Sequence, residues 1–173
     1  MKKNIYKLFA LSLLLIGATS CEKEEIGGTA VQDMCGEWYV MVDGVDANGN
    51  VTYEDPYDMG YFPLYTYNTN KNVPTEMYID DMGEFWDFRV IVNVDYAAKT
   101  FNATAAIDDY NEISVDILKG AIVKDGAKSP AGYIADSISF MVKFEDDTDA
   151  DDGYWDYLWI HGYRRTGLLG GYD

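Results

Sequence analysis

The sequence predicts an all-β fold in which eight antiparallel strands follow one another as an up-and-down meander and close into a barrel. The chain has 7 Phe, 4 Trp and 15 Tyr among 173 residues, and aromatic side chains favour strands. Apolar and polar residues alternate in short runs between turn-forming residues, and no window has the 3.6-residue period of a long amphipathic helix. The connections are too short for the helical crossovers that a parallel sheet needs.

The first 20 residues have the composition of a secretory signal peptide. Three lysines precede an apolar run at 8–16 that is too short to span a bilayer. Small residues then lead directly to Cys21, an order that resembles the lipobox of bacterial lipoproteins. The resemblance implies cleavage before Cys21 and acylation of its thiol and amine, which anchors a protein stably. The alternative is an ordinary secreted protein with a chance cysteine.

Residues 21–33 are predicted to form a polar tether between the lipidated cysteine and a single barrel domain at 34–173. The run Glu-Lys-Glu-Glu follows Cys21 directly. An acidic run at this place resembles the surface-export signal of Bacteroidetes lipoproteins, and a solvated tether explains it equally well. We therefore expect an outer-membrane lipoprotein of the bacterial cell envelope, exposed at the cell surface if the run is an export signal.

Eight strands are predicted in chain order, each bounded by turn-forming residues. They cover residues 36–43, 60–68, 75–80, 86–95, 100–105, 113–123, 136–145 and 154–163. The alternation in the seventh strand predicts that the even-numbered residues 138–144 face the core. Asn48-Gly49 predicts a tight turn, and Gly120 predicts a bulge in the sixth strand.

Closure of the meander is expected because it removes the two open edges of the sheet. In a barrel of eight strands the interior is filled by side chains or holds one small ligand. A sandwich of two sheets is the alternative architecture.

The charge of the chain excludes several functions. Removing residues 1–20 removes three lysines, so the mature chain has 10 basic and 30 acidic residues and a net charge of −20. This balance argues against a nucleic-acid partner and against electrostatic docking on anionic membranes. Acyl chains, rather than surface charge, are expected to hold the protein at the membrane. The sequence indicates no cofactor and carries no signal for an oligomeric state.

Gly36-Glu37-Trp38 opens the first predicted strand, and Arg164-Arg165 follows the last. This arrangement resembles the lipocalin or calycin pattern, in which an arginine after the last strand stacks on a tryptophan of the first. Closure brings these two strands together, so we predict that Arg164 or Arg165 stacks on Trp38. Such a contact contributes roughly 0.5–2 kcal/mol.

Four regions, spread over nearly the whole mature chain, resemble a Bacteroidetes lipoprotein family described as lipid-binding putative hydrolases. They are Gly-Glu-Trp-Tyr-Val (36–40), Thr-Tyr-Asn-Thr (66–69), Met-Tyr-Ile-Asp-Asp (77–81) with Phe-Trp-Asp-Phe-Arg-Val (85–90), and Asp-Ser-Ile-Ser-Phe (136–140) with Gly-Tyr-Arg-Arg-Thr-Gly (162–167). The resemblance implies a calycin-like barrel on a lipid anchor, and it carries over no catalytic residue.

Two sets of alternating aromatic residues are candidate ligand-binding faces. They are Tyr61, Tyr65 and Tyr67 in the second predicted strand, and Trp155, Tyr157 and Trp159 in the eighth. Aromatic side chains with polar tips suit a pocket for a lipid-like small molecule. Packing of the barrel core is the alternative, because a barrel of this size needs large inward side chains.

His161 is the one candidate for a catalytic base, because it is the only histidine of the chain. Ser137, on the neighbouring predicted strand, is a candidate partner. No serine lies in a Gly-x-Ser-x-Gly motif, and the strand-turn-helix that this motif needs is not predicted. A hydrogen-bonded strand histidine is therefore favoured over a catalytic one, and a binding protein over an enzyme.

Asp147, Asp149 and Asp151 have the spacing of the first three ligands in an EF-hand calcium loop. However, Asp152 stands at the place of the required glycine and Leu158 at that of the bidentate glutamate. A solvated hairpin turn is the favoured interpretation, and no metal site is predicted.

These observations and the resemblance lead us to expect a cell-envelope lipoprotein that binds a small apolar or amphipathic ligand in the barrel lumen. The alternatives are a hydrolase acting on lipid or glycan, and an accessory surface protein that binds a glycan or a protein partner. An open lumen lined by the aromatic residues favours the first function. A cavity with His161 beside a serine or carboxylate favours the second, and a filled lumen with an exposed aromatic patch favours the third.

Overall fold

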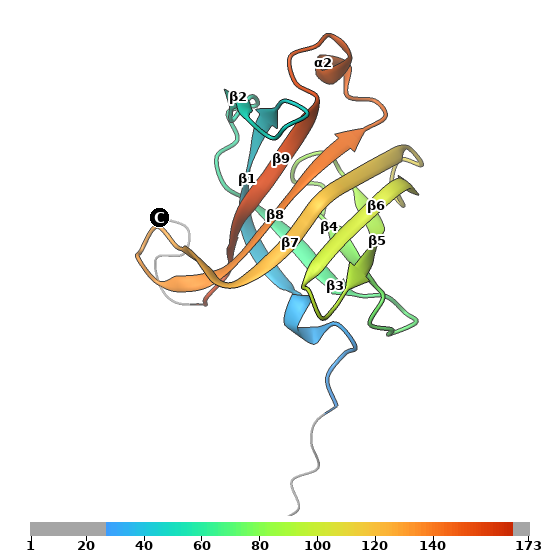
Figure 1. The fold of residues 1–173 in the computed structure, drawn as a ribbon, viewed down its shortest axis with the longest axis vertical. Coiled ribbons are helices and arrows are strands. Elements are labelled where there is room, and N and C mark those ends of the chain that lie inside the picture. Colours follow the sequence, from blue (N-terminus) through green and yellow to red (C-terminus); the bar gives the residue numbers. More distant parts are fainter. Residues whose placement is uncertain (1–26, 168–173) are drawn as a thin grey trace, which may run out of the picture.

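A computed structural model describes residues 27–167 as one antiparallel sheet (Figure 1). Its strands are β1 (Gly36–Val45), β2 (Val51–Glu54), β3 (Phe62–Asn68), β4 (Glu76–Asp80), β5 (Arg89–Asp95), β6 (Thr100–Ile107), β7 (Ser114–Lys128), β8 (Ile134–Phe144) and β9 (Tyr157–Arg164). Two short helices accompany them, η1 (Gln32–Met34) and α2 (Thr148–Asp151). None of the helices within 27–167 is long and apolar enough to cross a membrane. The predicted signal peptide, Cys21 and the start of the tether lie outside the described residues.

Pairing between β1 and β9 closes the barrel. Their register runs from Trp38 opposite Arg164 to Val45 opposite Tyr157. The first half of β1, from Gly36 to Val40, also pairs with β3, and each later strand pairs with its neighbour in the chain. Eight of the nine strands therefore form a closed up-and-down barrel. The predicted fold class is confirmed, and the sandwich alternative is wrong.

The ninth strand, β2, is an addition that the alternation of residue types does not predict. It forms a hairpin with the end of β1, with Glu54 opposite Asp43. All four β2 residues are exposed, so the strand lacks the period-2 pattern of a half-buried strand. The turn predicted at Asn48-Gly49 is confirmed, because Gly49 has φ +93° and its N–H donates to the Asp46 carbonyl at 2.9 Å.

Inward-facing side chains from all eight barrel strands form one continuous hydrophobic cluster. The core face predicted for the seventh strand is confirmed by the burial of Ile138, Phe140, Val142 and Phe144. The bulge predicted at Gly120 is also present, as the β7–β8 register shifts between Leu118 and Ala121. Because this cluster occupies the interior, the barrel is a packed core like that of most eight-stranded barrels.

An up-and-down barrel carries its connections at two opposite ends. One end, called the tether end below, holds η1, the β5–β6 turn, the β7–β8 hairpin and the end of β9, and the chain enters there from residue 27 (Figure 1). The opposite end, called the far end, holds the β1–β2 hairpin, the β4–β5 and β6–β7 loops and α2.

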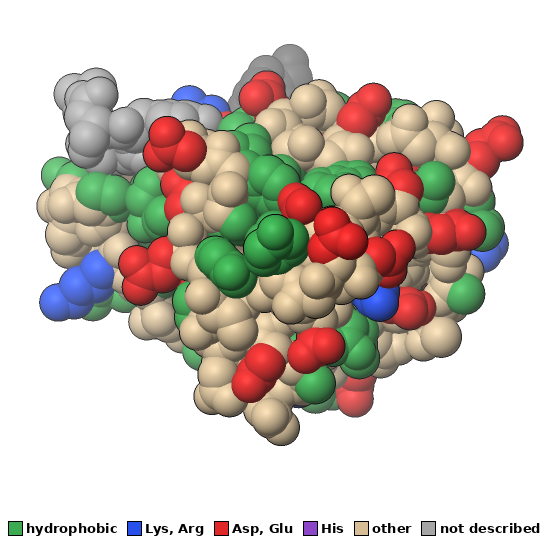
Figure 2. Space-filling model, turned by 90° about the horizontal axis from the view of Figure 1, so that it is seen from above, with side chains coloured by type: hydrophobic (Ala, Val, Ile, Leu, Met, Phe, Trp, Pro, Cys, Tyr) green, Lys and Arg blue, Asp and Glu red, His purple; other side chains and the backbone are tan. Residues whose placement is uncertain are grey.

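Charged residues divide unequally between the two ends. The half of the barrel at the tether end, made of residues 27–42, 65–78, 92–103, 120–139 and 161–167, has six basic and six acidic residues. The rest of the described chain has three basic and twenty acidic residues. The far half therefore carries the whole net charge of the described chain. Figure 2 views the far end, where acidic side chains surround a hydrophobic patch.

Buried aspartates organise the loops at the far end. The carboxylate of Asp81 accepts hydrogen bonds from five backbone N–H groups of residues 83–88, at 2.8–3.2 Å. Asp108 accepts three more, from Arg89, Tyr110 and Asn111. A buried carboxylate needs such donors to offset the loss of hydration. Part of the acidic composition is thus explained by loop structure rather than by a binding function.

Candidate functional site

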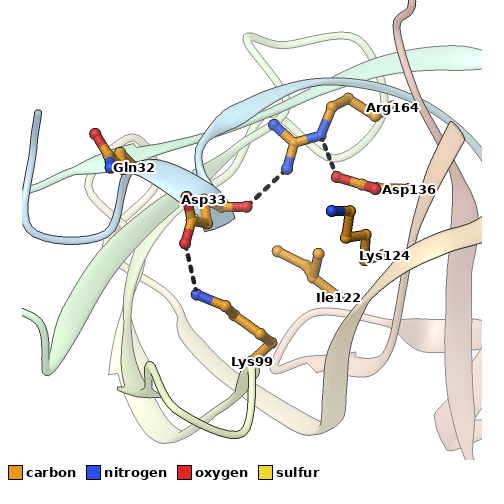
Figure 3. Close-up of a pocket in the computed structure, with 7 residues that line it drawn as sticks. All are labelled: Gln32, Asp33, Lys99, Ile122, Lys124, Asp136 and Arg164. Atoms are coloured by element: carbon orange, nitrogen blue, oxygen red, sulfur yellow. Dashed lines mark hydrogen bonds and ion pairs between the residues drawn. The ribbon is translucent and has the colours of Figure 1, made fainter.

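A pocket of about 470 Å³ opens at the tether end of the barrel, beside η1 (Figure 3). We call it the mouth pocket. Side chains from η1, the β5–β6 turn and strands β7, β8 and β9 line it: Gln32, Asp33, Lys99, Ile122, Lys124, Asp136 and Arg164. Because these residues are spread over the whole chain, the pocket exists only when the barrel is closed.

Arg164 forms the most firmly held wall of the mouth pocket. Its Cζ lies 4.4 Å from the centroid of the Trp38 ring, which is the stacking predicted from the sequence. Nη2 donates to the Asp33 carbonyl at 2.8 Å, and Nη1 donates to the Cys35 carbonyl. Nε forms an ion pair with Asp136 at 3.1 Å, at an angle outside hydrogen-bond geometry. One guanidinium therefore ties η1, β1, β8 and β9 together.

Gly36 provides the space that this guanidinium occupies. A Cβ placed on Gly36 would lie 2.8 Å from Nη1 of Arg164, closer than real Cβ contacts allow. Arg164 cannot move aside easily, because its other contacts hold it on Trp38. The glycine of the Gly-x-Trp motif is therefore explained by the position of the arginine.

The cations of the mouth pocket outnumber its carboxylates by three to two. Lys99 Nζ pairs with Asp33 at 3.1 Å and lies 3.4 Å from the Tyr96 ring centroid, whereas Lys124 is exposed. The pKa of the Asp33 carboxyl is held below its usual value, first by the hydrogen bond from the Tyr96 hydroxyl and then by Lys99. Buried Ile122 supplies an apolar surface beside these charges. The arrangement suits a ligand that is both anionic and apolar.

The aromatic face predicted in the second strand lies outside the barrel. In β3 the inward residues are Phe62, Leu64 and Thr66, which are buried. Tyr65 and Tyr67 therefore point outward, while Tyr61 precedes the strand and is 44% exposed. The expectation that this face lines the lumen is wrong, because both faces of the strand carry apolar residues and alternation does not reveal which is inward.

Tyr67 belongs to an outer cluster around Asp80, a carboxylate that is only 1% exposed. The Tyr67 hydroxyl donates to Asp80 at 2.5 Å, and the Tyr110 hydroxyl donates at 3.1 Å. Arg89 lies over the rings of Tyr78 and Tyr110. Burial raises the pKa of Tyr67, and its hydrogen bond to Asp80 raises it further. This cluster joins β3, β4, β5 and the β6–β7 loop.

Of the aromatic face predicted in the eighth strand, Trp155 joins the buried core cluster and the other two residues point outward. Leu158 and Ile160 are the inward residues of β9, and Tyr157 and Trp159 lie on its outer face. Trp155 precedes the strand and is buried at the far end, where its ring lies against Gly44. The physical reason is the same as in β3, since the alternation fits either orientation.

Asp147 has a structural role in the acidic loop. One carboxylate oxygen caps α2 by accepting from the Ala150 N–H at 3.1 Å, and the other accepts from Trp155 Nε1 at 2.9 Å. Within residues 27–167, no three His, Cys, Asp or Glu side chains are arranged to hold a metal ion. The predicted hairpin turn is in fact a helical turn, because Asp147 and the acidic residues after it favour a helix N-terminus.

A second pocket, of about 280 Å³, lies on the outer wall of the barrel and is called the outer-wall pocket. It is formed between the β1–β2 turn and the outer faces of β7, β8 and β9. Its lining residues are Asn48, Gly49, Lys119, Ser139, Phe140, Met141 and Trp159. Trp159 is thus the one residue of the predicted aromatic faces that lines either of the two pockets.

His161 lies on the outer face of β9, directly beside the outer-wall pocket. Its Nε2 is 3.0 Å from Oδ2 of Asp43, and its ring stacks on Trp159 with a centroid distance of 4.0 Å. The β8–β9 register places Ser139, rather than Ser137, opposite His161. Ser137 is opposite Tyr163, so the serine beside His161 lies two residues after the one expected from the sequence.

Sequence reasoning missed Asp43, Ser139 and Asp136 as neighbours of the predicted residues. Asp43 and His161 are 118 positions apart, and their contact follows from the register between β1 and β9. A register set by barrel closure leaves no local signal, since each residue alone fits an ordinary strand.

A family model described as "Lipid-binding putative hydrolase" matches residues 23–169. The match includes every strand of the barrel, the mouth pocket and the outer-wall pocket. No curated protein matches the chain at a significant level.

Proposed function

Because the chain belongs to the lipid-binding putative hydrolase family, we propose that it is a cell-envelope lipoprotein that binds a lipid-like ligand with an anionic head group. The site proposed for this ligand is the mouth pocket. The observation that carries the proposal is the lining of that pocket, where three cations and two carboxylates surround the aliphatic side chain of Ile122 in a strongly acidic protein. The expected site in the lumen is replaced because hydrophobic side chains occupy the interior.

The size and chemistry of the mouth pocket support an amphipathic ligand. A volume of about 470 Å³ lies within the usual range of ligand sites, roughly 300–1,000 Å³. Lys124 and Lys99 would contact the anionic head group, and Ile122 would contact the first part of an alkyl chain. Hydrogen bonds to charged groups contribute about 1.5–3 kcal/mol each, and burial of an alkyl segment adds about 0.8 kcal/mol per methylene.

The position of the proposed anchor supports the same site. Acylation of Cys21 would attach the chain to a bilayer, and ten residues separate Cys21 from η1, which lines the mouth pocket. Ten residues span at most about 33–36 Å when extended. The pocket would then lie close enough to the membrane surface to take up an amphipath from it.

The charge distribution favours the same orientation. A surface of anionic lipids repels the far half, with its twenty acidic residues, and has little net effect on the balanced tether half. The acyl anchor and the electrostatic repulsion therefore act together, and both keep the mouth pocket toward the membrane.

Lys124→Glu tests this function. The full chain is purified from a bacterial host in mild detergent, and the lipids bound to it are extracted and identified by mass spectrometry. We expect anionic amphipaths from the native protein and about tenfold less from Lys124→Glu. Lys143→Glu makes the same charge change in the far half and should retain the ligand. Equal recovery of lipid from the two variants would refute the proposal. The proposal would also fail if no lipid co-purified with the native protein and added fatty acid left its melting temperature unchanged.

Binding of a glycan is a second candidate function, supported by exposed tyrosines at the far end, where Figure 2 shows a hydrophobic patch. Tyr53 and Tyr154 are about half exposed, and their ring centroids lie 5.9 Å apart. Aromatic faces with neighbouring carboxylates suit the apolar and hydroxyl surfaces of a sugar. A glycan array should show binding that Tyr154→Ala abolishes and Lys124→Glu leaves intact; no binding to any glycan would exclude this candidate.

A further inference from the structure

We propose that Ser139, His161 and Asp43 form a hydrolytic triad on the outer wall of the barrel and that its substrates are carboxylic esters. The three residues come from the adjacent strands β8, β9 and β1. The site is separate from the mouth pocket, and the proposal does not depend on lipid binding there.

Strand register places the serine beside the histidine. Ser139 and His161 are directly opposite each other in the β8–β9 ladder, and both point outward because Phe140 and Ile160 point into the core. The Cβ atoms of such a pair lie about 4.5–5.5 Å apart on one face of the sheet. Rotation about χ1 therefore swings the Ser139 hydroxyl toward the imidazole. Catalytic hydrogen bonds of this kind often tighten only when substrate is bound.

Asp43 fixes the orientation and tautomer of His161. Its Oδ2 lies 3.0 Å from Nε2, so that nitrogen carries the proton and Nδ1 is the acceptor. Oδ1 of Asp43 accepts from the backbone N–H of Asp55 at 3.0 Å, which holds the carboxylate in place. Trp159 covers one face of the imidazole. The roles of the two ring nitrogens are thus reversed relative to the triad of chymotrypsin-like proteases.

The outer-wall pocket supplies room for the ester beside Ser139. Its volume of about 280 Å³ and its walls of Trp159 and Met141 fit the acyl part of a small ester. Lys119 lines the same pocket, at a bulge of β7 where its φ is +54°. Such a backbone conformation is costly for a residue with a Cβ and recurs at functional sites. Its ammonium group would stabilise the oxyanion that forms during attack.

The proposed reaction has two steps. Ser139 Oγ attacks the ester carbonyl while Nδ1 of His161 takes the hydroxyl proton; the ester C–O bond then breaks, and the alcohol leaves with that proton. The acyl group remains on Ser139 as an ester. Water then attacks this acyl-serine with His161 again accepting and returning the proton, which releases the carboxylic acid and restores the serine.

Labelling with a fluorophosphonate probe tests the proposal on the full chain in detergent. We expect one labelled peptide that contains Ser139, and loss of the label in Ser139→Ala. Ser137→Ala is the matched control, since this serine lies on the same face of the same strand opposite Tyr163. It should label like the native protein.

Hydrolysis of p-nitrophenyl butyrate provides the second measurement. In His161→Gln and Asp43→Asn, we expect kcat/KM to fall at least 100-fold and tenfold, respectively, in variants whose circular dichroism is native. The triad would be overturned by a label on another residue or by the absence of both label and hydrolysis. Undiminished activity in His161→Gln would overturn it as well.

Discussion

At the scale of single residues, Arg164 has the largest structural role. It stacks on Trp38, donates to two backbone carbonyls and pairs with Asp136. These contacts connect the first strand, the last strand and η1. The closing of the barrel and the wall of the mouth pocket therefore depend on the same side chain.

Replacing Arg164 with alanine should lower the free energy of unfolding by about 2–4 kcal/mol, because the ring contact and the charged hydrogen bonds are lost together. Arg165→Ala is the matched control. Arg165 pairs with Glu37 at the surface, where such pairs contribute about 0–1 kcal/mol. Urea denaturation of both variants measures the difference, and equal losses would contradict the assigned role of Arg164.

The thiol of Cys35 should react slowly in the folded protein. Burial raises its pKa, and Sγ donates to the Val31 carbonyl at 3.3 Å. A raised pKa leaves less thiolate at pH 8 than in an unfolded chain, and the thiolate is the reactive form. In a Cys21→Ser background, we expect alkylation by iodoacetamide at pH 8 to be at least tenfold slower than in 8 M urea. Comparable rates would show that Cys35 is accessible.

At the scale of elements, the acidic loop between β8 and β9 is ordered by one carboxylate. Asp147 caps α2 and accepts the indole N–H of Trp155, which in turn covers Gly44. A Cβ on Gly44 would lie 2.8 Å from that ring. The loop is therefore part of the far-end core.

Asp147→Ala should destabilise the protein by about 2–3 kcal/mol, since it removes a helix cap and leaves the buried indole N–H of Trp155 without a partner. Asp151→Ala, an exposed neighbour in the same loop, should change stability by less than about 0.5 kcal/mol. Thermal unfolding with EDTA and with calcium distinguishes this account from a metal site. A calcium-dependent rise of Tm that is lost in both variants would revive the metal hypothesis.

At the scale of the whole molecule, charge is polarised along the barrel. The tether half is neutral and the far half holds twenty acidic residues against three basic ones. Mutual repulsion in the far half should destabilise the fold at low ionic strength, where the Debye length is about 30 Å at 0.01 M salt and about 8 Å at 0.15 M. The same polarity separates the proposed ligand end from the end that faces away from the membrane.

We therefore predict that Lys143→Glu lowers Tm more than Lys124→Glu does at 0.01 M salt, because Lys143 lies in the acidic half. The difference should vanish at 0.5 M salt, where the repulsion is screened. Thermal unfolding of the two variants at both salt concentrations measures this. A difference that persists at high salt would point to packing rather than to charge.

Much of the fold could be predicted from the sequence because strand alternation and turn residues are local signals. The even-numbered core residues of β8 and the turn at Asn48-Gly49 follow from such signals. The stacking on Trp38 follows from the resemblance to the calycin pattern and from barrel closure. The β2 strand could not be predicted, since all its residues are exposed. The inward faces of β3 and β9 could not be predicted, because both faces of these strands are partly apolar.

The sequence alone determines the all-β class and the barrel meander, because residue periodicity and turn residues are local signals. The resemblance to the calycin pattern adds the stacking of Arg164 or Arg165 on Trp38. The tertiary structure decides which face of each strand is inward and which distant residues meet. It places Tyr65, Tyr67, Tyr157 and Trp159 outside the barrel, fills the lumen and forms the mouth pocket. It also brings Ser139, His161 and Asp43 together on the outer face of three adjacent strands. The register of β8, β9 and β1 sets this arrangement, and register is a property of the closed sheet rather than of any local segment.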